Sequence, residues 1–350
     1  MTKHRTLAIS TISLLTLGVF AMGCGEMDDS GDQTVTSALQ DQEWTAFQRN
    51  DHALMFETSG GVFSSNSGAF VATGTVPSQV KLSGGAVVAG FQRNDGHWVV
   101  DQFTPNNSHS FTITNGLIRG GTSPGLALCA GCSLWAFGFQ GTDGRLWFGT
   151  GGNANNGNPT AAFLAAGTSP SFAMTSSGVV QFGFMGVNGH LWVGLNGITS
   201  GVDSTHGVAT GTSPSVGVGG PNNLFGVAFQ GSNGHLWFGG GGQSQFDKSS
   251  IAIKTGTSPT LAVAADGTRT FVAYQSAANG VLHVWRNENG AESDSQINLG
   301  MQNTATPKIT PILTSGYQIA LKGFNGHLWI VVNSSGGIGQ EQIQDQGFAM

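Results

Sequence analysis

The sequence predicts an all-β chain folded as a seven-bladed β-propeller, with four antiparallel strands in each blade. A short phrase recurs seven times and is clearest as FQGSNGHLWF, from Phe229 to Phe238. A second phrase, Gly-Thr-Ser-Pro, alternates with it. It ends at Pro124, Pro170, Pro214 and Pro259, and relaxed versions end at Pro77 and Pro307. A repeat of about 45 residues is typical of a unit of four short strands, and such units build propellers.

Each copy of the first phrase predicts a strand, a turn and a strand. Asn-Gly or Asp-Gly between alternating apolar residues favours a two-residue type I′ hairpin, which needs positive φ twice. Around Phe229 we expect strands over 225–229, 235–238, 251–254 and 260–264. The first inner strand is expected at about 33–40 and the last outer strand at about 340–348. No segment after the leader keeps a helical period. A β-solenoid is the rival fold, although its rungs are usually shorter and lack Asn-Gly hairpins.

The N-terminus predicts export. Basic residues at 3–5 precede an apolar run over 7–22, which is the layout of a signal peptide. The run ends Ala-Met-Gly-Cys and resembles a bacterial lipobox, except that Leu is usual at the position of Ala21. We therefore expect a leader over 1–24, a lipidated Cys24, an acidic tether over 25–38 and one propeller domain over 39–350. An outer-membrane or cell-surface lipoprotein is expected, and free secretion is the alternative. No other stretch is apolar for long enough to span a bilayer.

The remaining cysteines, Cys129 and Cys132, lie where two strands of the third blade should turn around. Outside the cytosol they are expected to close a small loop as a disulfide. The alternative is a redox-active Cys-x-x-Cys, which normally opens a helix in a thioredoxin-like unit. The sequence shows no such unit.

The composition narrows the partners. Lys and Arg total 13 and Asp and Glu total 19, so only 9% of residues are charged and the net charge is −6. An ordinary domain has about 25% charged residues. A basic stripe for nucleic acid is absent. The many amides, hydroxyls and aromatic rings suit a neutral polyhydroxylated ligand, and they equally suit a propeller that binds no ligand.

The repeated unit, Gly-Thr-Ser-Pro followed by Val-Ala-Phe-Gln-(Gly/Ala)-x-Asn/Asp-Gly-x-Leu-Trp, resembles the bacterial propeller lectins related to tectonins and fucose-binding lectins. The resemblance covers about residues 40–348. It implies neutral sugars, fucosylated glycans among them, bound in shallow pockets between blades at several places in the ring.

The repeated side chains permit that chemistry. A Trp ring offers a flat apolar platform to a sugar, and nearby polar groups can bind its hydroxyls. The expected platforms are Trp147, Trp192, Trp237 and Trp329. The expected polar partners are His190, His235, His327, Arg145, Gln140, Gln230 and the Ser and Thr of the Pro phrase. Packing between blades is the competing role for the Trp residues, solvent exposure for the His residues, and a fixed turn for Gly-Thr-Ser-Pro.

Enzymatic activity is not expected, and neither is a cofactor or a metal. The histidines recur once per blade and so should not gather as metal ligands. No Asp or Glu is expected beside them as a base, and the sequence has no Gly-x-Ser-x-Gly nucleophile elbow. Two interpretations remain: a non-enzymatic, multivalent lectin, and a propeller that scaffolds protein, envelope or coat partners.

Overall fold

The computed structural model describes residues 45–350 except 59–60, 65–69, 83–85, 104–108, 130–133, 195–200, 221, 241–245, 313–314, 336 and 338. Six four-stranded sheets and one three-stranded sheet make up this part of the chain, and all paired strands are antiparallel. A single 3₁₀ turn, η1 (Ala154–Asn156), is the only helical element among the described residues. The predicted all-β propeller with four-stranded antiparallel blades is confirmed, and parallel solenoid rungs are not present in the described sheets.

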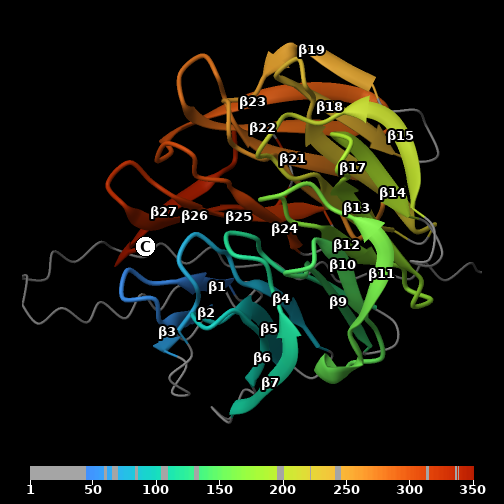
Figure 1. Ribbon diagram of the computed structural model, residues 1–350. Helices are drawn as coiled ribbons and strands as arrows, with labels where there is room; N and C mark the ends of the chain where they lie inside the picture. The colour runs from blue at the N-terminus through green and yellow to red at the C-terminus, as the bar shows by residue number, and fades with distance from the viewer. Residues whose placement is uncertain are drawn as a thin grey trace, which may run out of the picture. The chain divides into compact units, whose positions relative to one another are not determined.

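The strands follow the chain order within each sheet, from the first strand to the fourth (Figure 1). The three-stranded sheet holds β1 (Thr45–Gln48), β2 (Leu54–Thr58) and β3 (Gly61–Ser64). The next sheet holds β4 (Ser78–Lys81), β5 (Val87–Gln92), β6 (His97–Phe103) and β7 (His109–Leu117). The third holds β8 (Gly125–Leu128), β9 (Trp135–Gln140), β10 (Arg145–Gly149) and β11 (Asn158–Phe163). The fourth holds β12 (Ser171–Met174), β13 (Val180–Met185), β14 (His190–Gly194) and β15 (Val202–Gly207).

The last three sheets complete the described domain. The fifth holds β16 (Ser215–Gly219), β17 (Leu224–Gln230), β18 (His235–Gly240) and β19 (Phe246–Ala252). The sixth holds β20 (Thr260–Val263), β21 (Arg269–Gln275), β22 (Val281–Glu288) and β23 (Ala291–Gly300). The seventh holds β24 (Lys308–Ile312), β25 (Gly316–Lys322), β26 (His327–Asn333) and β27 (Gln342–Ala349). The last outer strand was expected at about 340–348, where β27 lies.

The sheets pack face to face through seven apolar clusters. Six of the clusters join two sheets that follow one another in the chain, as Phe182 and Phe184 of β13 do with Ala136 of β9. The sheet β1–β3 packs on β5 and β6 through one cluster and on β24 and β26 through another. The cycle of contacts therefore closes between the ends of the described domain, and Figure 1 shows the red strands β25–β27 returning beside the blue β1. Strands such as β13 are buried on both faces, which explains their continuous apolar sequence.

The sheet β1–β3 lacks one of the four strands that were predicted for every blade. Its β1 carries Phe47 and Gln48, which correspond to Phe91 and Gln92 in the second strand of the next sheet. The strand expected inside β1, at about 33–40, lies outside the described residues. Six sheets thus match the predicted four-stranded blade, and the first is partial.

The hairpin turn differs from the predicted type I′ turn. In the fourth sheet the backbone N–H of Gly186 donates to His190 O and the N–H of Gly189 donates to Gly186 O, each over 2.9 Å. Gly189 has a φ of +78°, whereas Asn188 does not have a positive φ. These features define a three-residue loop in which the last residue alone is left-handed, the second common hairpin geometry. The turn therefore does not need a positive φ at Asn188, whose side chain accepts from Trp192 Nε1.

The predicted strand over 251–254 was misplaced. β19 begins earlier, at Phe246, and ends at Ala252, and Ile253 instead bridges to Ser276 of the next sheet. The link after the fourth strand thus pairs with the hairpin of the following sheet. The same bridge joins Leu164 to Gly186 and Val208 to Gly231. The Asn-Gly turns and the links to the next blade therefore lie on one face of the domain.

The Gly-Thr-Ser-Pro phrase is a turn that also ties each blade to the next. Its Thr is buried, and the Thr212 hydroxyl donates to Ala209 O over 2.7 Å. Its Ser hydroxyl accepts a backbone N–H from the preceding blade. The N–H of Ser169 donates to Ser213 Oγ, and that of Ser213 donates to Ser258 Oγ, each over 2.9 Å. The same bond joins Val76 to Ser123, Ser123 to Ser169 and Ser258 to Thr306. These hydroxyls therefore form a relay between blades.

The first strands of the six complete sheets line a central cavity of about 460 Å³, walled mainly by Pro, Val, Leu and Ser. Lys308 lies in this wall, and its Nζ donates to Pro77 O over 3.1 Å. Burial lowers the pKa of Lys308 to about 8.

Several sequence predictions fall on the N-terminal segment and on one loop. The leader over 1–24, Cys24 and the tether over 25–38 lie outside the described residues. Cys129 is disulfide-bonded, and its expected partner Cys132 also lies outside them. Within the described part of the chain, no helix is both long and apolar enough to cross a membrane.

Candidate functional site

The four predicted platform tryptophans occupy equivalent, half-buried positions on the third strands of their sheets. One face of the ring packs inward on the second strand. Trp147 stacks on Phe139 with the ring centroids 6.0 Å apart, and Trp192 stacks on Phe184 at 6.2 Å. The indole N–H donates to the Asx side chain of the turn, as from Trp192 Nε1 to Asn188 Oδ1 over 3.1 Å. The equivalent bonds are Trp147 to Asp143, Trp237 to Asn233 and Trp329 to Asn325.

A glycine lies beneath each of these indole rings. A Cβ on Gly231 would lie 2.3 Å from Trp237 Nε1 and 2.4 Å from its Cδ1, so no larger residue fits. Gly141, Gly186 and Gly323 lie beneath the other three rings in the same way. The three sheets that lack the Trp have Arg49, Arg93 and Ser276 at this position. The Gly and the Trp are therefore one packing unit.

The same rings also contact the preceding sheet. Trp192 packs against the cluster that contains Leu146 of β10 and Leu164, and Trp237 against the cluster that contains Val208. The edge of His206, at the end of β15, approaches the Trp237 ring with centroids 5.0 Å apart. Each Trp thus lies at a junction between two sheets with part of its surface exposed. Trp98 of the second sheet stands one residue before the position equivalent to these tryptophans, is only 1% exposed and belongs to the core.

Each predicted histidine has an aspartate beside it, contrary to the expectation that no acid recurs there. His190 Nδ1 lies 3.1 Å from both carboxylate oxygens of Asp203. His235 Nδ1 lies 3.3 Å from Asp247 Oδ1. His327 Nδ1 lies 3.0 Å from Asp345 Oδ2. The side chains of His190 and Asp203 are 37% and 29% exposed, so a ligand in solution can reach them.

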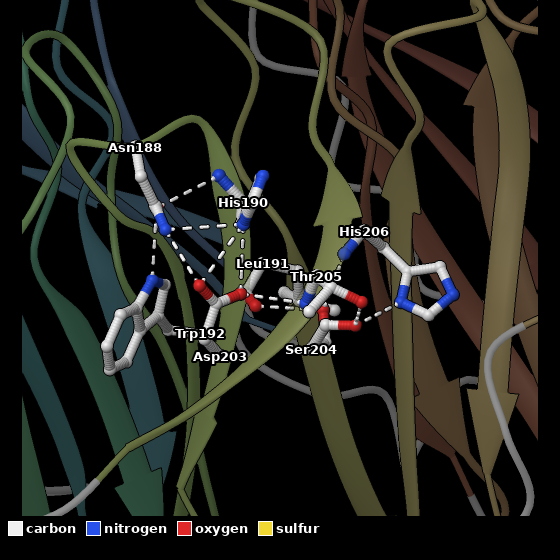
Figure 2. A network of polar contacts seen from close by, with 8 residues as sticks. All are labelled: Asn188, His190, Leu191, Trp192, Asp203, Ser204, Thr205 and His206. Atoms are coloured by element: carbon white, nitrogen blue, oxygen red, sulfur yellow. Dashed lines mark hydrogen bonds and ion pairs between the residues drawn. The ribbon is translucent and has the colours of Figure 1, made fainter.

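The turn asparagine joins the Trp to this pair. In Figure 2, Asn188 lies between Trp192 and Asp203, with His190 above the carboxylate. Asn188 Oδ1 accepts from Trp192 Nε1, and Asn188 Nδ2 donates to Asp203 Oδ2 over 2.8 Å. Asn233 makes the same bond to Asp247 over 2.8 Å, and Asn325 to Asp345 over 3.0 Å. We call the Asn, Asp and His of this repeated set the polar triad, and the triad together with its Trp the polar triad site of the fourth, fifth and seventh sheets.

A bulge between the third and fourth strands brings the aspartate to the histidine. Trp192 pairs with Asp203 and His190 with Gly207, so residues 204–206 face a single residue on the partner strand. The N–H of Thr205 donates to Asp203 Oδ1 over 2.7 Å. This bond is the main cause that lowers the pKa of Asp203. Burial opposes it, and the His190 and Asn188 side chains add to it. The carboxylate is therefore ionised at neutral pH.

These aspartates were not predicted from the sequence because their distance from the histidine along the chain is not constant. The Asp follows the His by 13, 12 and 18 residues in the three sheets, because the loop between the third and fourth strands varies in length. Counted back from the following Gly-Thr-Ser-Pro, Asp203 and Asp247 lie at nearly the same distance. The position of the Asp in the sequence is therefore regular relative to the end of the fourth strand, and irregular relative to the His on the third strand.

The third and sixth sheets have other residues at the positions of the polar triad site. In the third sheet Arg145 replaces the His, and Pro159 faces Trp147 where the others have Asp. The Arg145 guanidinium lies 5.2 Å from the Phe163 ring centroid. In the sixth sheet His283 takes the Trp position and bonds Asp294 over 2.9 Å. Asp294 also accepts from the Tyr274 hydroxyl over 2.8 Å.

Two predicted ligand contacts lie in the interior. Gln140 and Gln230 are 0% and 2% exposed, and each donates its Nε2 to the link that leaves its own sheet. Gln140 donates to Leu164 O over 3.0 Å, and Gln230 to Ile253 O over 2.9 Å. The Ser and Thr of the Pro phrase are likewise engaged in the turn and in the relay between blades. These groups are not available to a surface ligand in this conformation.

Among the residues that the structure describes, no cluster of three or more His, Cys, Asp or Glu is arranged to hold a metal ion. The three predicted histidines, His190, His235 and His327, lie in separate sheets, each paired with its own carboxylate. What the structure brings together is a half-exposed aromatic ring, an amide, a carboxylate and an imidazole, in the fourth, fifth and seventh sheets.

Solved structures with this fold include several lectins. The lectin BP39L from Burkholderia pseudomallei has 13% sequence identity and a TM-score of 0.61 over 86% of this chain and 98% of its own. AofleA from Arthrobotrys oligospora has 12% identity and a TM-score of 0.58 over 87% and 88%. The six-bladed Aleuria aurantia lectin, described with a fucose recognition mode, has 14% identity and a TM-score of 0.55 over 77% and 93%.

The chain shares their propeller fold. At these identities the likeness establishes the fold alone. No protein-family model and no curated protein matches the sequence.

Proposed function

We propose that the protein is a non-enzymatic, multivalent carbohydrate-binding protein whose sites lie at the junctions between blades. The observation that carries the proposal is the polar triad site, which places an exposed His–Asp pair beside a half-exposed Trp in three sheets. Propeller lectins among the structural neighbours support the same interpretation.

The chemistry of each group suits a neutral sugar. The exposed part of the Trp ring can contact the C–H face of a pyranose, and the His edge can bond one hydroxyl. The proposed contacts are Trp192 with His190, Trp237 with His235, and Trp329 with His327. Trp147 with Arg145 forms a variant site that offers only hydrogen-bond donors on its cation. Gln140 and Gln230 are left out, since they are buried.

A scaffold without sugar binding is the second candidate. The indole N–H of Trp192 or Trp237 is already hydrogen-bonded to the turn Asn, and one face of the ring packs on Phe184 or Phe229. Both contacts are expected of a Trp whose role is to pack between blades. The partial exposure of the His–Asp pairs favours the lectin, because a Trp that only packs between blades does not need an exposed His–Asp pair beside it.

The wider organisation follows from the same proposal. The sheet β1–β3 would be completed to a seventh four-stranded blade by the segment at about 33–40. An exported lipoprotein anchored through Cys24 would display the ring at a cell surface, and cleavage elsewhere would release it as a secreted lectin. Glycans are the proposed partners.

A direct binding titration tests the function. The protein lacking its first 24 residues would be titrated with methyl α-L-fucoside and other neutral monosaccharides while tryptophan fluorescence is followed. We expect saturable quenching in the parent, and no binding by calorimetry when Trp147, Trp192, Trp237 and Trp329 are all replaced by Ala in a variant that circular dichroism shows to be folded. A folded quadruple variant that binds as the parent does would refute the Trp contacts. Failure of the parent to bind any sugar would favour the scaffold.

A further inference from the structure

The contacts of the polar triad site bear on where each of its histidines carries a proton. Asn188 Oδ1 accepts two N–H groups, the indole of Trp192 over 3.1 Å and the backbone of His190 over 3.2 Å. These two donors determine which end of the amide is the oxygen, so Nδ2 must face Asp203. The turn therefore orients the amide before any ligand arrives.

The carboxylate then determines the imidazole tautomer. Asp203 is ionised and can only accept, and it receives the Asn188 Nδ2–H over 2.8 Å. His190 Nδ1 lies 3.1 Å from the same carboxylate and 3.2 Å from Asn188 Nδ2, which gives one hydrogen to Asp203. The charged carboxylate outweighs the neutral amide, so the favourable arrangement has a hydrogen on Nδ1. A lone pair on Nδ1 would instead face a negative oxygen, which is repulsive. In a neutral imidazole with its proton on Nδ1, Nε2 carries a lone pair.

We propose that Asp203, Asp247 and Asp345 are positioning residues that hold His190, His235 and His327 with the proton on Nδ1, so that Nε2 is presented as the acceptor for a ligand hydroxyl. The ligand half of this statement rests on the proposed carbohydrate-binding function. The tautomer half rests on the protein alone. The ligand class it selects is a neutral polyol that donates one hydroxyl hydrogen at each of these three sites.

The third sheet provides an internal comparison. Its turn has Asp143 in place of Asn, so the turn side chain accepts from Trp147 over 3.2 Å and has no N–H to give. A second carboxylate beside it would be repelled, and the facing residue is Pro159. Arg145 then replaces the histidine and presents only donors. Trp, Asp and His of the polar triad site thus occur together in this chain. The variant site of the third sheet offers hydrogen-bond donors where the polar triad sites offer an acceptor.

The tautomer is measurable without a ligand. The protein would be labelled with ¹⁵N-histidine, and long-range ¹H–¹⁵N correlation spectra would be recorded at a pH where the imidazoles are neutral. Signals would be assigned by single His→Gln substitutions. We expect His190, His235 and His327 to show a protonated Nδ1 and an unprotonated Nε2. A proton on Nε2 in these three rings of the parent protein would overturn the proposal.

Asp247 is the best site for substitution. The fifth sheet has its Asn233 and His235 contacts to this carboxylate, without the backbone bond that Thr205 gives Asp203. Asp247→Leu should shift the His235 signals toward the Nε2–H tautomer, and Asp247→Asn, which keeps a carbonyl acceptor, should restore part of the parent pattern. His190 and His327 serve as controls in the same spectrum and should not move. An unchanged His235 pattern in a folded Asp247→Leu variant would show that the carboxylate does not set the tautomer.

A second arm tests the ligand half. Monodeoxyfluoro analogues of a bound methyl glycoside replace one hydroxyl with a fluorine, which removes the donor while keeping the size similar. Loss of one donated hydrogen bond should weaken binding about tenfold at one ring position. Equal binding of all analogues, or no sugar binding by a protein that shows the expected tautomers, would overturn the ligand half. The second outcome would separate a failure of the proposed function from a failure of the positioning mechanism.

Discussion

Replacing Gly231 with Ala tests whether the half-exposed Trp is locked by the glycine beneath it. The added Cβ would lie 2.3 Å from Trp237 Nε1 and 2.7 Å from Asn233 Oδ1, which is closer than atoms in contact can approach. Gly231 does not have a positive φ, so the backbone itself accepts Ala. Overpacking typically costs about 1–3 kcal/mol, and the lost Trp–Asn hydrogen bond about 0.5–1.5 kcal/mol. We expect a loss of about 2–3 kcal/mol in the free energy of unfolding.

Urea denaturation of four proteins measures this effect. They are the parent, Gly231→Ala, Trp237→Val and the double variant, with Val chosen because the second sheet has Val99 at the Trp position. In the Trp237→Val background, Gly231→Ala should cost almost nothing, because the clashing ring is gone. Gly120→Ala is the matched control, since nothing lies within 4 Å of a Cβ there. An equal cost of Gly231→Ala in both backgrounds would refute the coupling.

Three further predictions are testable, two drawn from the structure and one from the N-terminal sequence. Ser213→Ala removes one acceptor of the hydroxyl relay and should cost about 1 kcal/mol by urea denaturation, whereas Ser232→Ala on the exposed turn should cost much less; equal costs would exclude a stabilising relay. The pKa values of Asp203 and Asp345 lie below the ordinary value, so the unfolded chain binds more protons. The stability from these groups is full above about pH 4 and is lost as the pH falls through the lowered pKa values, and a double Asp→Asn variant should show a flatter acid limb. Mass spectrometry of the mature N-terminus should find lipid on Cys24, and an unmodified chain that starts elsewhere, unaffected by Cys24→Ser, would contradict the anchor.

The sequence predicted the fold well because each blade repeats its own local signals. The apolar pattern around Phe229 and the Gly after Asn233 placed β17 and β18 within one or two residues of where they lie. The outer strand β19 was misplaced because its alternation is weak and a bulge interrupts its pairing. The turn type was wrong because a three-residue loop and a two-residue loop both use Asn-Gly.

The candidate site was only partly predictable. The Trp and His positions follow from strand alternation after the turn, and the structure places both at the surface of a junction. Asp203 was missed because it reaches His190 only through the bulge, across a loop of variable length. Gln140 was misjudged because its polar side chain bonds the departing backbone inside the domain. Pairings across a bulge and polar groups that satisfy buried carbonyls both depend on tertiary contacts that a linear pattern does not contain.

A glycan array tests the central claim most directly. The protein lacking its first 24 residues would be compared with a folded variant that has His190, His235 and His327 replaced by Ala. Binding to a dense glycan surface depends steeply on the number of working sites, because avidity multiplies across linked sites. The account predicts that the parent binds neutral glycans and that the triple variant loses nearly all surface binding. A parent protein that binds no glycan, or a triple variant that binds as strongly as the parent, would contradict it.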